Sequence, residues 1–289
     1  MTVGIVGLGF VGMALAERLL ESGEDVCGID PDPARGALLA AAGANSAPSL
    51  PALAGACSAV VLAVYDAEQI EDVLFGAEGL AMGDARLTFL CVTTCTPERA
   101  AGFARRLAER GHALIEFPLS GTSTQIRHGE ATGLVAGDAE ARAEHVLLLA
   151  TLCPERVELG PAGSAAVVKL GINLVLQLNR AALAEGLAFA EAMGLEPAGF
   201  LEALRRSAAA SAVMVGKGPK MVARDFHPES RIAQTLKDAD MICETAREAG
   251  QHLPMMTAQR ELLRDAIELV GGDRDSSAVI EAIRPGRLI

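Results

Sequence analysis

The sequence lacks several features that mark other classes of protein. It has no tryptophan, one tyrosine and an aromatic content of 3% in 289 residues. Acidic residues outnumber basic ones and leave a formal net charge of −12. Nucleic acids and anionic membranes are bound through a basic surface, so this charge argues against both as partners. The six cysteines show neither CxxC nor metal-ligand spacing. They predict buried free thiols in a reducing cytoplasm and no metal site.

The sequence also lacks a targeting or membrane-spanning pattern. No lysine or arginine precedes the first apolar stretch, Thr2 to Ala16, as a secretory signal would require. The stretch from residue 36 to 65 carries no charge, but Gly43, Pro48 and Pro51 divide it into short elements. We therefore expect a soluble, cytoplasmic protein without a membrane partner.

Lysine is scarce relative to arginine. Of the 25 lysines and arginines, only Lys169, Lys217, Lys220 and Lys237 are lysines. Where any cation suffices this chain uses arginine, so a retained lysine points to a task that arginine cannot perform. The main such task is losing a proton, because a guanidinium group stays charged at any accessible pH.

The order of apolar and amphipathic segments predicts an α/β domain followed by an all-helical one. Half of the chain is hydrophobic, enough to bury a substantial core. In the first half, short apolar runs alternate with helical patterns, which is typical of a parallel sheet covered by helices. The expected strands are 2–6, 25–29, 59–64, 87–92, 113–117, 132–136 and 156–159, and the helices between them are 11–21, 34–42, 67–75, 97–110 and 139–151. A long helical stretch follows at 165–193, with only helical periodicity beyond it. We place the domains at 1–160 and 161–289, joined by this long helix.

A glycine motif follows the first expected strand directly. Gly7, Gly9 and Gly12 have the spacing GxGxxG and lead into a helix. In a dinucleotide-binding Rossmann domain these glycines make the tight turn, admit the pyrophosphate and let the helix pack on the strand. The second strand leads to Asp30, whose carboxylate is expected to bind the ribose hydroxyls. The expected cofactor-binding residues of this region are Gly7, Leu8, Gly9, Phe10, Val11, Gly12, Asp30, Val64 and Tyr65.

Asp30 also bears on the choice of cofactor. A carboxylate at this position repels the 2′-phosphate of NADP and so favours NAD, although Arg35 nearby softens that repulsion. Flavoproteins and S-adenosylmethionine enzymes can share this first motif. The motif alone therefore does not distinguish these two classes from NAD(P)-dependent enzymes, and the remainder of the chain is needed.

Four further segments, in order, resemble the β-hydroxyacid dehydrogenase family, which includes 3-hydroxyisobutyrate, tartronate-semialdehyde and 6-phosphogluconate dehydrogenases. Thr93-Thr94-Cys95-Thr96-Pro97 is similar to the family's cofactor loop, and Glu116-Phe117-Pro118-Leu119-Ser120-Gly121-Thr122 to its substrate loop. Gly160-Pro161-Ala162-Gly163 with Lys169 and Asn173 resembles its catalytic helix, and Lys237-Asp238 a pair in its helical domain. With the glycine motif, these segments cover nearly the whole chain. They imply an NAD(P)-dependent oxidoreductase acting on a small 3-hydroxy acid or its oxo or semialdehyde form.

Lys169 is the expected general acid–base. It is the only lysine before residue 217. Its apolar setting is expected to lower its pKa by disfavouring the ammonium form, as does the positive nicotinamide of an oxidised cofactor. Asn173 and Gln177 follow at i+4 and i+8 and form a polar stripe on the helix. The alternative is a lysine whose charged head only reaches solvent from a helix start.

The resemblance implies how these residues share the reaction. Lys169 would remove the hydroxyl proton of the substrate during hydride transfer, while Asn173 holds that oxygen. Ser120, with backbone N–H groups around Gly121, would receive a substrate carboxylate; an ordinary strand-to-loop turn is the alternative.

The resemblance also adds Thr94, Thr96 and Lys237 to the residues that contact the cofactor. A threonine before proline often only caps a helix, and a lysine in a helical domain is often only a solvated surface residue. Both alternatives stay open on the sequence.

Three positions depart from the family pattern. Ile172 stands where the family often has an amide, Phe117 replaces an alanine, and Thr122 replaces the second glycine of the substrate loop. We expect these changes to surround the substrate, so the sequence does not identify the acid.

Two other functions stay open. Imine reductases resemble this fold and cofactor site but typically lack the catalytic lysine. A regulatory protein that binds a nucleotide without catalysis would need only the glycine loop and Asp30. For assembly, the long apolar helix suggests contact with a second subunit, and the resemblance implies a homodimer or homotetramer.

Overall fold

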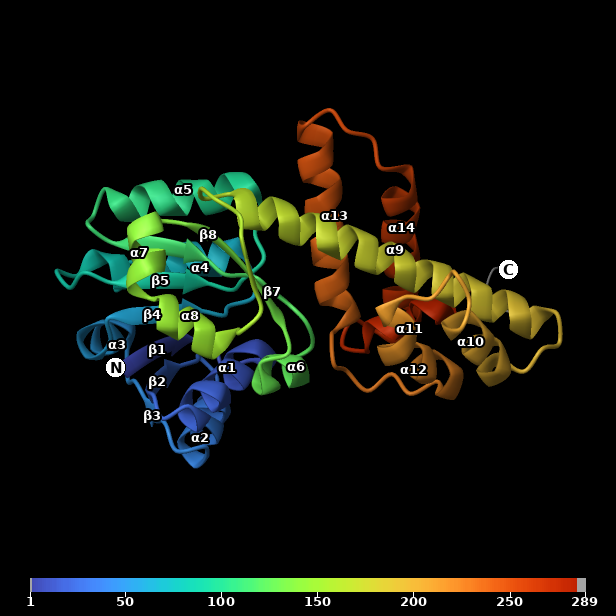
Figure 1. The fold of residues 1–289 in the computed structure, drawn as a ribbon, viewed down its shortest axis with the longest axis horizontal. Helices are drawn as coiled ribbons and strands as arrows, with labels where there is room; N and C mark the ends of the chain where they lie inside the picture. The colour runs from blue at the N-terminus through green and yellow to red at the C-terminus, as the bar shows by residue number, and fades with distance from the viewer. Residues whose placement is uncertain (1, 285–289) are drawn as a thin grey trace. The chain divides into compact units, whose positions relative to one another are not determined.

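The computed structural model describes residues 2–284, which divide into two compact units (Figure 1). The first unit ends at Lys169 and the second begins at Leu170, so the division falls inside one long helix, α9 (Ser164–Ala192). The N-terminal unit is α/β and the C-terminal unit is helical, as the sequence predicts.

The first unit is a sheet with helices packed on both faces (Figure 1). Its strands are β1 (Thr2–Val6), β2 (Asp25–Ile29), β3 (Asn45–Ser46), β4 (Ala59–Leu62), β5 (Thr88–Cys91), β6 (Ala113–Glu116), β7 (Leu119–Ser120), β8 (Thr132–Gly137) and β9 (Arg156–Glu158). Its helices are α1 (Phe10–Glu21), α2 (Pro33–Ala41), α3 (Leu50–Ala56), α4 (Ala67–Phe75), α5 (Pro97–Ala108), α6 (Ser123–His128), α7 (Ala139–Glu144) and α8 (Val146–Leu152), with a 3₁₀ turn at Leu80–Met82.

The sheet is mixed rather than parallel throughout, which corrects the sequence prediction. Its order is β3-β2-β1-β4-β5-β6-β8-β7, with β9 paired to β8. The strands from β3 to β6 are parallel, but β8 is antiparallel to both β6 and β7. Only Phe117 and Pro118 separate β6 from β7. Because β8 pairs with both of these strands, it returns alongside them in the opposite direction, as in a hairpin.

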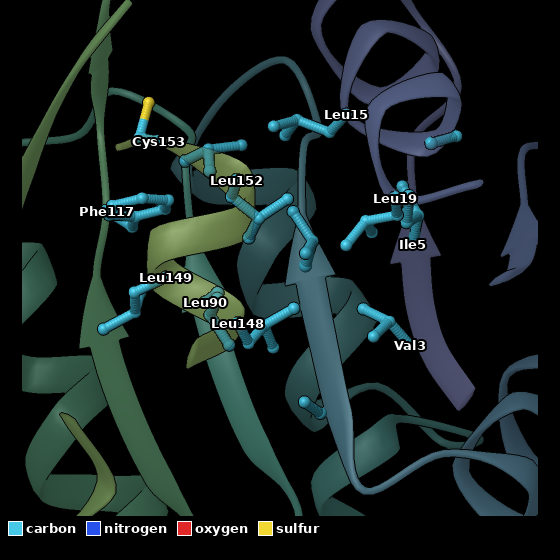
Figure 2. Close-up of a cluster of buried hydrophobic side chains, with 14 of the residues drawn as sticks. Val3, Ile5, Leu15, Leu19, Leu90, Phe117, Leu148, Leu149, Leu152 and Cys153 are labelled. Atoms are coloured by element: carbon cyan, nitrogen blue, oxygen red, sulfur yellow. The ribbon is translucent and has the colours of Figure 1, made fainter. Parts of the chain in front are cut away.

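Strict alternation along the central strands builds two cores. In β4, Ala59 and Val61 belong to the cluster on one face, whereas Val60 and Leu62 belong to the cluster on the other. All four side chains are buried, as expected for a strand covered on both faces. Figure 2 shows part of the first cluster, with the leucines of α8 packed among side chains of the sheet and α1.

The second unit is built from helices. Besides the remainder of α9 it contains α10 (Pro197–Arg205), α11 (Ala212–Gly216), α12 (Gly218–Ala223), α13 (Ile232–Glu248), α14 (Pro254–Val270) and a 3₁₀ segment at Ser276–Ala282. Leu183 and Leu187 of α9 share one buried cluster with Leu263 of α14. Among the described residues of this unit, the sole β pairing is an isolated bridge between Arg231 and Asp275.

Helix α9 has two features that bear on function. By length and composition alone it could cross a membrane, but a core helix of a soluble protein passes the same test. Its face within the second unit carries the buried polar residues Asn173, Gln177 and Arg180. These side chains would be costly to place in lipid.

Candidate active site

The glycine loop between β1 and α1 has the geometry that a dinucleotide requires. Gly7 has φ +90°, and a Cβ atom there would lie 2.5 Å from the Ala63 carbonyl oxygen. A Cβ atom on Gly12 would lie 1.9 Å from the Gly7 oxygen, so only glycine lets α1 start this close to the strand. No acidic side chain lies in the first turn of α1 and no described side chain caps it. The positive end of α1 therefore suits a pyrophosphate, and these residues fit NAD(P).

Asp30 lies directly beside this loop. Its Oδ2 accepts a hydrogen bond from Leu8 N at 2.7 Å, and its Oδ1 accepts one from Asp32 N at 2.9 Å. Arg35 Nε lies 3.9 Å from Asp30 Oδ1 and 3.6 Å from Asp32 Oδ2, so the guanidinium is held loosely. Arg35 Nη1 would lie 3.2 Å from a Cβ atom on Gly9. An acidic and a basic group therefore both adjoin the glycine loop.

The remaining cofactor candidates of the first unit lie in the loops after β4 and β5. The Thr93 hydroxyl donates to Val64 O at 2.9 Å and ties the two loops together. Tyr65 is exposed, and its backbone N–H donates to Gln69 Oε1. Thr96 accepts from Arg99 N at 3.3 Å and caps α5, which is the alternative role considered for it.

Lys169 reaches the substrate loop from the first turns of α9. Its Nζ donates to Leu119 O at 2.7 Å, directly before Ser120. Lys169 also lines a small pocket with about 220 Å³ of empty space that is partly open to solvent. The other lining residues come from the end of β5 and the loop after it, the end of β6 and its link to β7, and α9: Cys91, Thr93, Thr94, Cys95, Glu116, Pro118 and Ala166. The structure thus brings Lys169, Thr94 and the start of the substrate loop together within the first unit.

Two buried acidic groups of this pocket have raised pKa values. Burial raises the pKa of Glu116, an effect partly offset by the backbone N–H groups of Gly163 and Ala166 that donate to it. A hydrogen bond with Cys95 raises the pKa of the Cys91 thiol well above its usual value, and burial adds to the effect. The Cys91 thiol therefore stays protonated at neutral pH and contributes apolar lining.

Ser120 and Gly121 lie at the end of β7, where the strand meets α6. Ser120 pairs with Thr132 of β8 and is partly exposed. Gly121 is exposed with φ +156°. Thr122 and Gln125 form a capping box at the start of α6: Gln125 Oε1 accepts from Thr122 N, and Thr122 Oγ1 accepts from Gln125 N. The N–H of Thr122 is thus engaged by Gln125, which leaves Ser120 and Gly121 as the candidate groups for a carboxylate.

Two of the three departures from the family pattern have local structural roles in the first unit. Phe117 is fully buried in the core of the first unit (Figure 2), where its ring would lie 2.6 Å from a Cβ atom on Gly133. Thr122 caps α6. The expectation that these two residues surround the substrate is therefore wrong for Phe117, and Thr122 has a local role that accounts for it.

Within the second unit, two candidates, Asn173 and Lys237, lie beside one carboxylate, that of Asp238. Asn173 Nδ2 donates to Asp238 Oδ2 at 2.9 Å, and Lys237 Nζ lies 3.7 Å from Asp238 Oδ1. One turn beyond Asn173 on α9, Gln177 Nε2 donates to Thr235 O at 3.3 Å. The polar stripe predicted for α9 thus faces α13, and the Lys237-Asp238 pair lies beside Asn173.

Sequence reasoning missed two buried charged residues. The resemblance places Glu116 in the substrate loop but assigns it no role. Arg180 continues the polar stripe of α9 and is 5% exposed. Burial lowers its pKa to about 10, although the charges of Asp275 and Asp238 oppose the shift. Helical spacing three residues after Gln177 was the available signal for Arg180.

Comparison with known proteins gives matches along both units. The sequence model for the NAD-binding domain of 6-phosphogluconate dehydrogenase matches residues 2–160. The model described as NAD-binding of NADP-dependent 3-hydroxyisobutyrate dehydrogenase matches residues 163–283. L-threonate dehydrogenase of Cupriavidus necator is 32% identical over 98% of this chain and 96% of its own. 2-Hydroxy-3-oxopropionate reductase of Escherichia coli is 29% identical over 98% of this chain and 97% of its own.

Solved structures agree with these sequence matches. A crystal structure of 3-hydroxyisobutyrate dehydrogenase from Salmonella typhimurium superposes with a TM-score of 0.89 at 27% identity, covering 97% of this chain and 99% of that one. An imine reductase from Streptomyces aurantiacus shares the fold at a TM-score of 0.67 and 22% identity, over 98% of this chain and all of that one. The chain belongs to the β-hydroxyacid dehydrogenase family of 3-hydroxyisobutyrate and 6-phosphogluconate dehydrogenases, NAD(P)-dependent oxidoreductases that act on a CH–OH group.

Proposed function

We propose that this enzyme interconverts a small 3-hydroxy acid and its oxo or semialdehyde form, with Lys169 as the general acid–base. The observation that carries the proposal is the position of Lys169 Nζ. It lies 2.7 Å from Leu119 O, beside Ser120, in a pocket that it shares with Thr94. A proton-transferring group, a carboxylate-binding loop and a cofactor loop therefore adjoin one another.

In this mechanism each group of the chain has one task. The nicotinamide, when bound, supplies the hydride acceptor or donor. Neutral Lys169 takes the hydroxyl proton during oxidation, and protonated Lys169 returns it to the carbonyl oxygen during reduction. Asn173 lies four residues further along α9; Asp238 takes one of its amide hydrogens, and the second remains to hold the reacting oxygen.

The substrate class follows from the loop that precedes α6. Ser120 supplies a hydroxyl donor and Gly121 a backbone N–H, a pair suited to a carboxylate. Two of the relatives support this class by name, since one is a dehydrogenase of L-threonate and the other a reductase of 2-hydroxy-3-oxopropionate.

For the cofactor, we propose NAD in preference to NADP. Asp30 at the end of β2 can accept hydrogen bonds from ribose hydroxyls and repels a 2′-phosphate. Arg35, loosely held beside the same loop, offsets part of that repulsion. The preference is therefore expected to be moderate.

We further propose a homodimer or homotetramer in the cytoplasm. The part of α9 in the second unit exposes several large apolar side chains: Val175, Leu176 and Phe189. Burial of these side chains against a second copy would remove them from water. All six cysteines are free thiols, which supports a reducing compartment. Light scattering that returns the mass of a single chain would contradict the assembly.

The proposed activity is tested with a panel of 3-hydroxy acids, their methyl esters and a cyclic imine, each assayed with NAD(H) and NADP(H). We expect turnover of at least one free acid and loss of that turnover with its ester, because the ester lacks the carboxylate. Turnover of the imine alone would identify an imine reductase. Cofactor binding without turnover of any compound would favour a regulatory protein.

A further inference from the structure

The carboxylate of Glu116, at the end of β6, holds the N-terminus of α9. Glu116 is 3% exposed. Its Oε1 accepts a hydrogen bond from Gly163 N, and its Oε2 accepts one from Ala166 N at 3.0 Å. Both oxygens therefore bind the first turn of the helix that carries Lys169, from a position 47 residues earlier in the chain. All of these residues lie in the first unit.

The segment that contains Glu116 also contacts Lys169 directly. Three residues after Glu116, the Leu119 carbonyl accepts from Lys169 Nζ at 2.7 Å. Ala166 and Lys169 are three residues apart on α9 and so lie on the same side of the helix. The segment from the end of β6 to the start of β7 thus contacts α9 at two points. Glu116 binds the backbone at Ala166, and the Leu119 carbonyl binds the side chain of Lys169.

Burying a carboxylate to hold the start of a helix is energetically unfavourable. Burial raises the pKa of Glu116, so its charged form is disfavoured, and the two N–H donors recover only part of that cost. An exposed aspartate at the helix cap, with two carboxylate oxygens, could accept from two backbone N–H groups without this penalty. Glu116 lines the same pocket as Lys169, which indicates that the location of the contact matters.

We propose that Glu116 is a positioning residue for Lys169: by fixing the first turn of α9 against β6, it sets where the lysine amine lies in the pocket. The inference rests on the proposed acid–base role of Lys169. Glu116 itself need not touch the substrate. Because a displacement of about 1 Å at a reacting group can cost about 10²-fold in rate, a shift of this turn should reduce kcat more than it changes KM.

The test is a double-mutant cycle. Glu116→Gln keeps the size of the side chain but offers one acceptor oxygen to two N–H donors, so one donor meets an NH₂ group. Glu116→Asp keeps both oxygens on a shorter arm. We expect Glu116→Gln to lower kcat about tenfold or more with KM changed less than about threefold, and Glu116→Asp to recover part of the loss. In the Lys169→Ala background the same Glu116→Gln change should alter the residual kcat less than about twofold.

Asp138→Asn is the matched control. Asp138 caps α7 in the same unit by accepting from Ala141 N at 2.8 Å, but it does not line the pocket. Its replacement should leave kcat within about twofold, since the amide oxygen of asparagine can still accept from Ala141 N and cap the helix. Thermal unfolding of every variant shows which of them are folded, and Glu116→Asp carries the test if Glu116→Gln does not fold.

The outcomes separate this inference from the proposed function. An equal loss of kcat in both backgrounds, or no loss in either, would overturn the positioning role while leaving Lys169 in place. Wild-type activity in Lys169→Ala alone would refute the acid–base proposal, and the inference about Glu116 with it.

Discussion

At the scale of single residues, the scarcity of lysine points to a special role for only some of the four lysines. Lys169 lines the pocket beside the substrate loop. Lys217, in contrast, is buried against Asp275, with its Nζ 2.8 and 3.0 Å from the two carboxylate oxygens. A compact ammonium suits such a site, so Lys217 is retained for packing and charge rather than for proton transfer. Composition alone does not distinguish these two reasons for keeping a lysine.

Asp275 is the most heavily hydrogen-bonded carboxylate among the described residues of the second unit. Besides Lys217 it accepts from the backbone N–H groups of Glu229, Ser230 and Ser277 and from the Ser277 hydroxyl. Asp275→Asn would remove the buried counter-charge of the Lys217 ammonium and leave it only the half-exposed carboxylate of Glu229, 3.3 Å away, so we expect a loss of about 3 kcal/mol in the free energy of unfolding. Urea unfolding measures it. Glu244→Gln, which breaks an exposed ion pair with Arg247, should leave the urea midpoint nearly unchanged.

The same carboxylate gives a pH dependence with a definite sign. Burial acts to raise the pKa of Asp275, but the hydrogen bond and charge of Lys217, with the backbone donors, hold it well below the usual range. A depressed folded-state pKa stabilises the fold above the ordinary value of about 3.9, and this contribution is lost as the pH falls further. The stability difference between wild type and Asp275→Asn should therefore shrink below about pH 4. A constant difference from pH 7 to pH 3 would contradict the assignment.

Asp30 carries the prediction on cofactor choice. Because it adjoins the glycine loop through Leu8 N, it is expected to bind the ribose hydroxyls and repel an additional phosphate. Steady-state kinetics should show at least about tenfold higher kcat/KM with NAD than with NADP, or about 1.4 kcal/mol. Asp30→Ala should bring the kcat/KM values with NAD and NADP closer together, because the repelling carboxylate is removed. Equal efficiency with both cofactors in the wild type would remove Asp30 from the ribose role.

At the scale of elements, the sequence located the strongly patterned segments and missed the short ones. The predicted strands at 2–6 and 25–29 match β1 and β2, because buried apolar runs between polar turns are distinctive. The predicted helix at 139–151 is two helices that meet at His145. Helices α3 and α6 were missed, although each carries a start signal: Ser49 caps α3, and Thr122 with Gln125 forms the capping box of α6. Short helices offer too few turns for periodicity to be seen.

Substitutions within the glycine loop test the close approach of α1 to β1. Gly12→Ala would place a Cβ atom 1.9 Å from the Gly7 carbonyl oxygen, which is backbone and cannot move aside alone. We expect the affinity for NADH, measured by fluorescence titration, to fall by about tenfold or more, together with lower stability.

Gly102→Ala in α5 is the control, because a Cβ atom there meets nothing within 4 Å. It should leave NADH binding intact and add about 0.5–1 kcal/mol of stability. Intact binding in Gly12→Ala would exclude the loop from the cofactor site.

At the scale of the whole molecule, the sequence predicted the division into an α/β and a helical part, the cofactor class and the family. The sequence could not predict that β8 runs antiparallel to β6 and β7. The apolar pattern of β8 marks it as a strand but does not determine the direction in which it pairs with its neighbours. Nor could the sequence assign Phe117 to the core, since the motif marks its place in the chain but not the direction of its side chain. The identity of the acid is set by a few side chains around Ser120 and Lys169, so it has to be measured.

The central claim is that Lys169 transfers a proton, and substitution of this residue tests it most directly. Lys169→Ala should lower kcat by about 10²–10⁴-fold, with NADH binding and thermal stability little changed. In the wild type, the rate of oxidation should rise with pH as the amine becomes neutral, and Lys169→Ala should lose that dependence. Lys220→Arg, at a lysine that donates to His227 O in the second unit, should keep full activity.

The decisive measurement is the kcat of Lys169→Arg. Arginine keeps the positive charge but cannot accept a proton, so the account predicts a variant almost as inactive as Lys169→Ala. If the charge alone were sufficient, Lys169→Arg would retain most of the wild-type turnover. That result would contradict the acid–base mechanism, even though the chain would remain a member of its family.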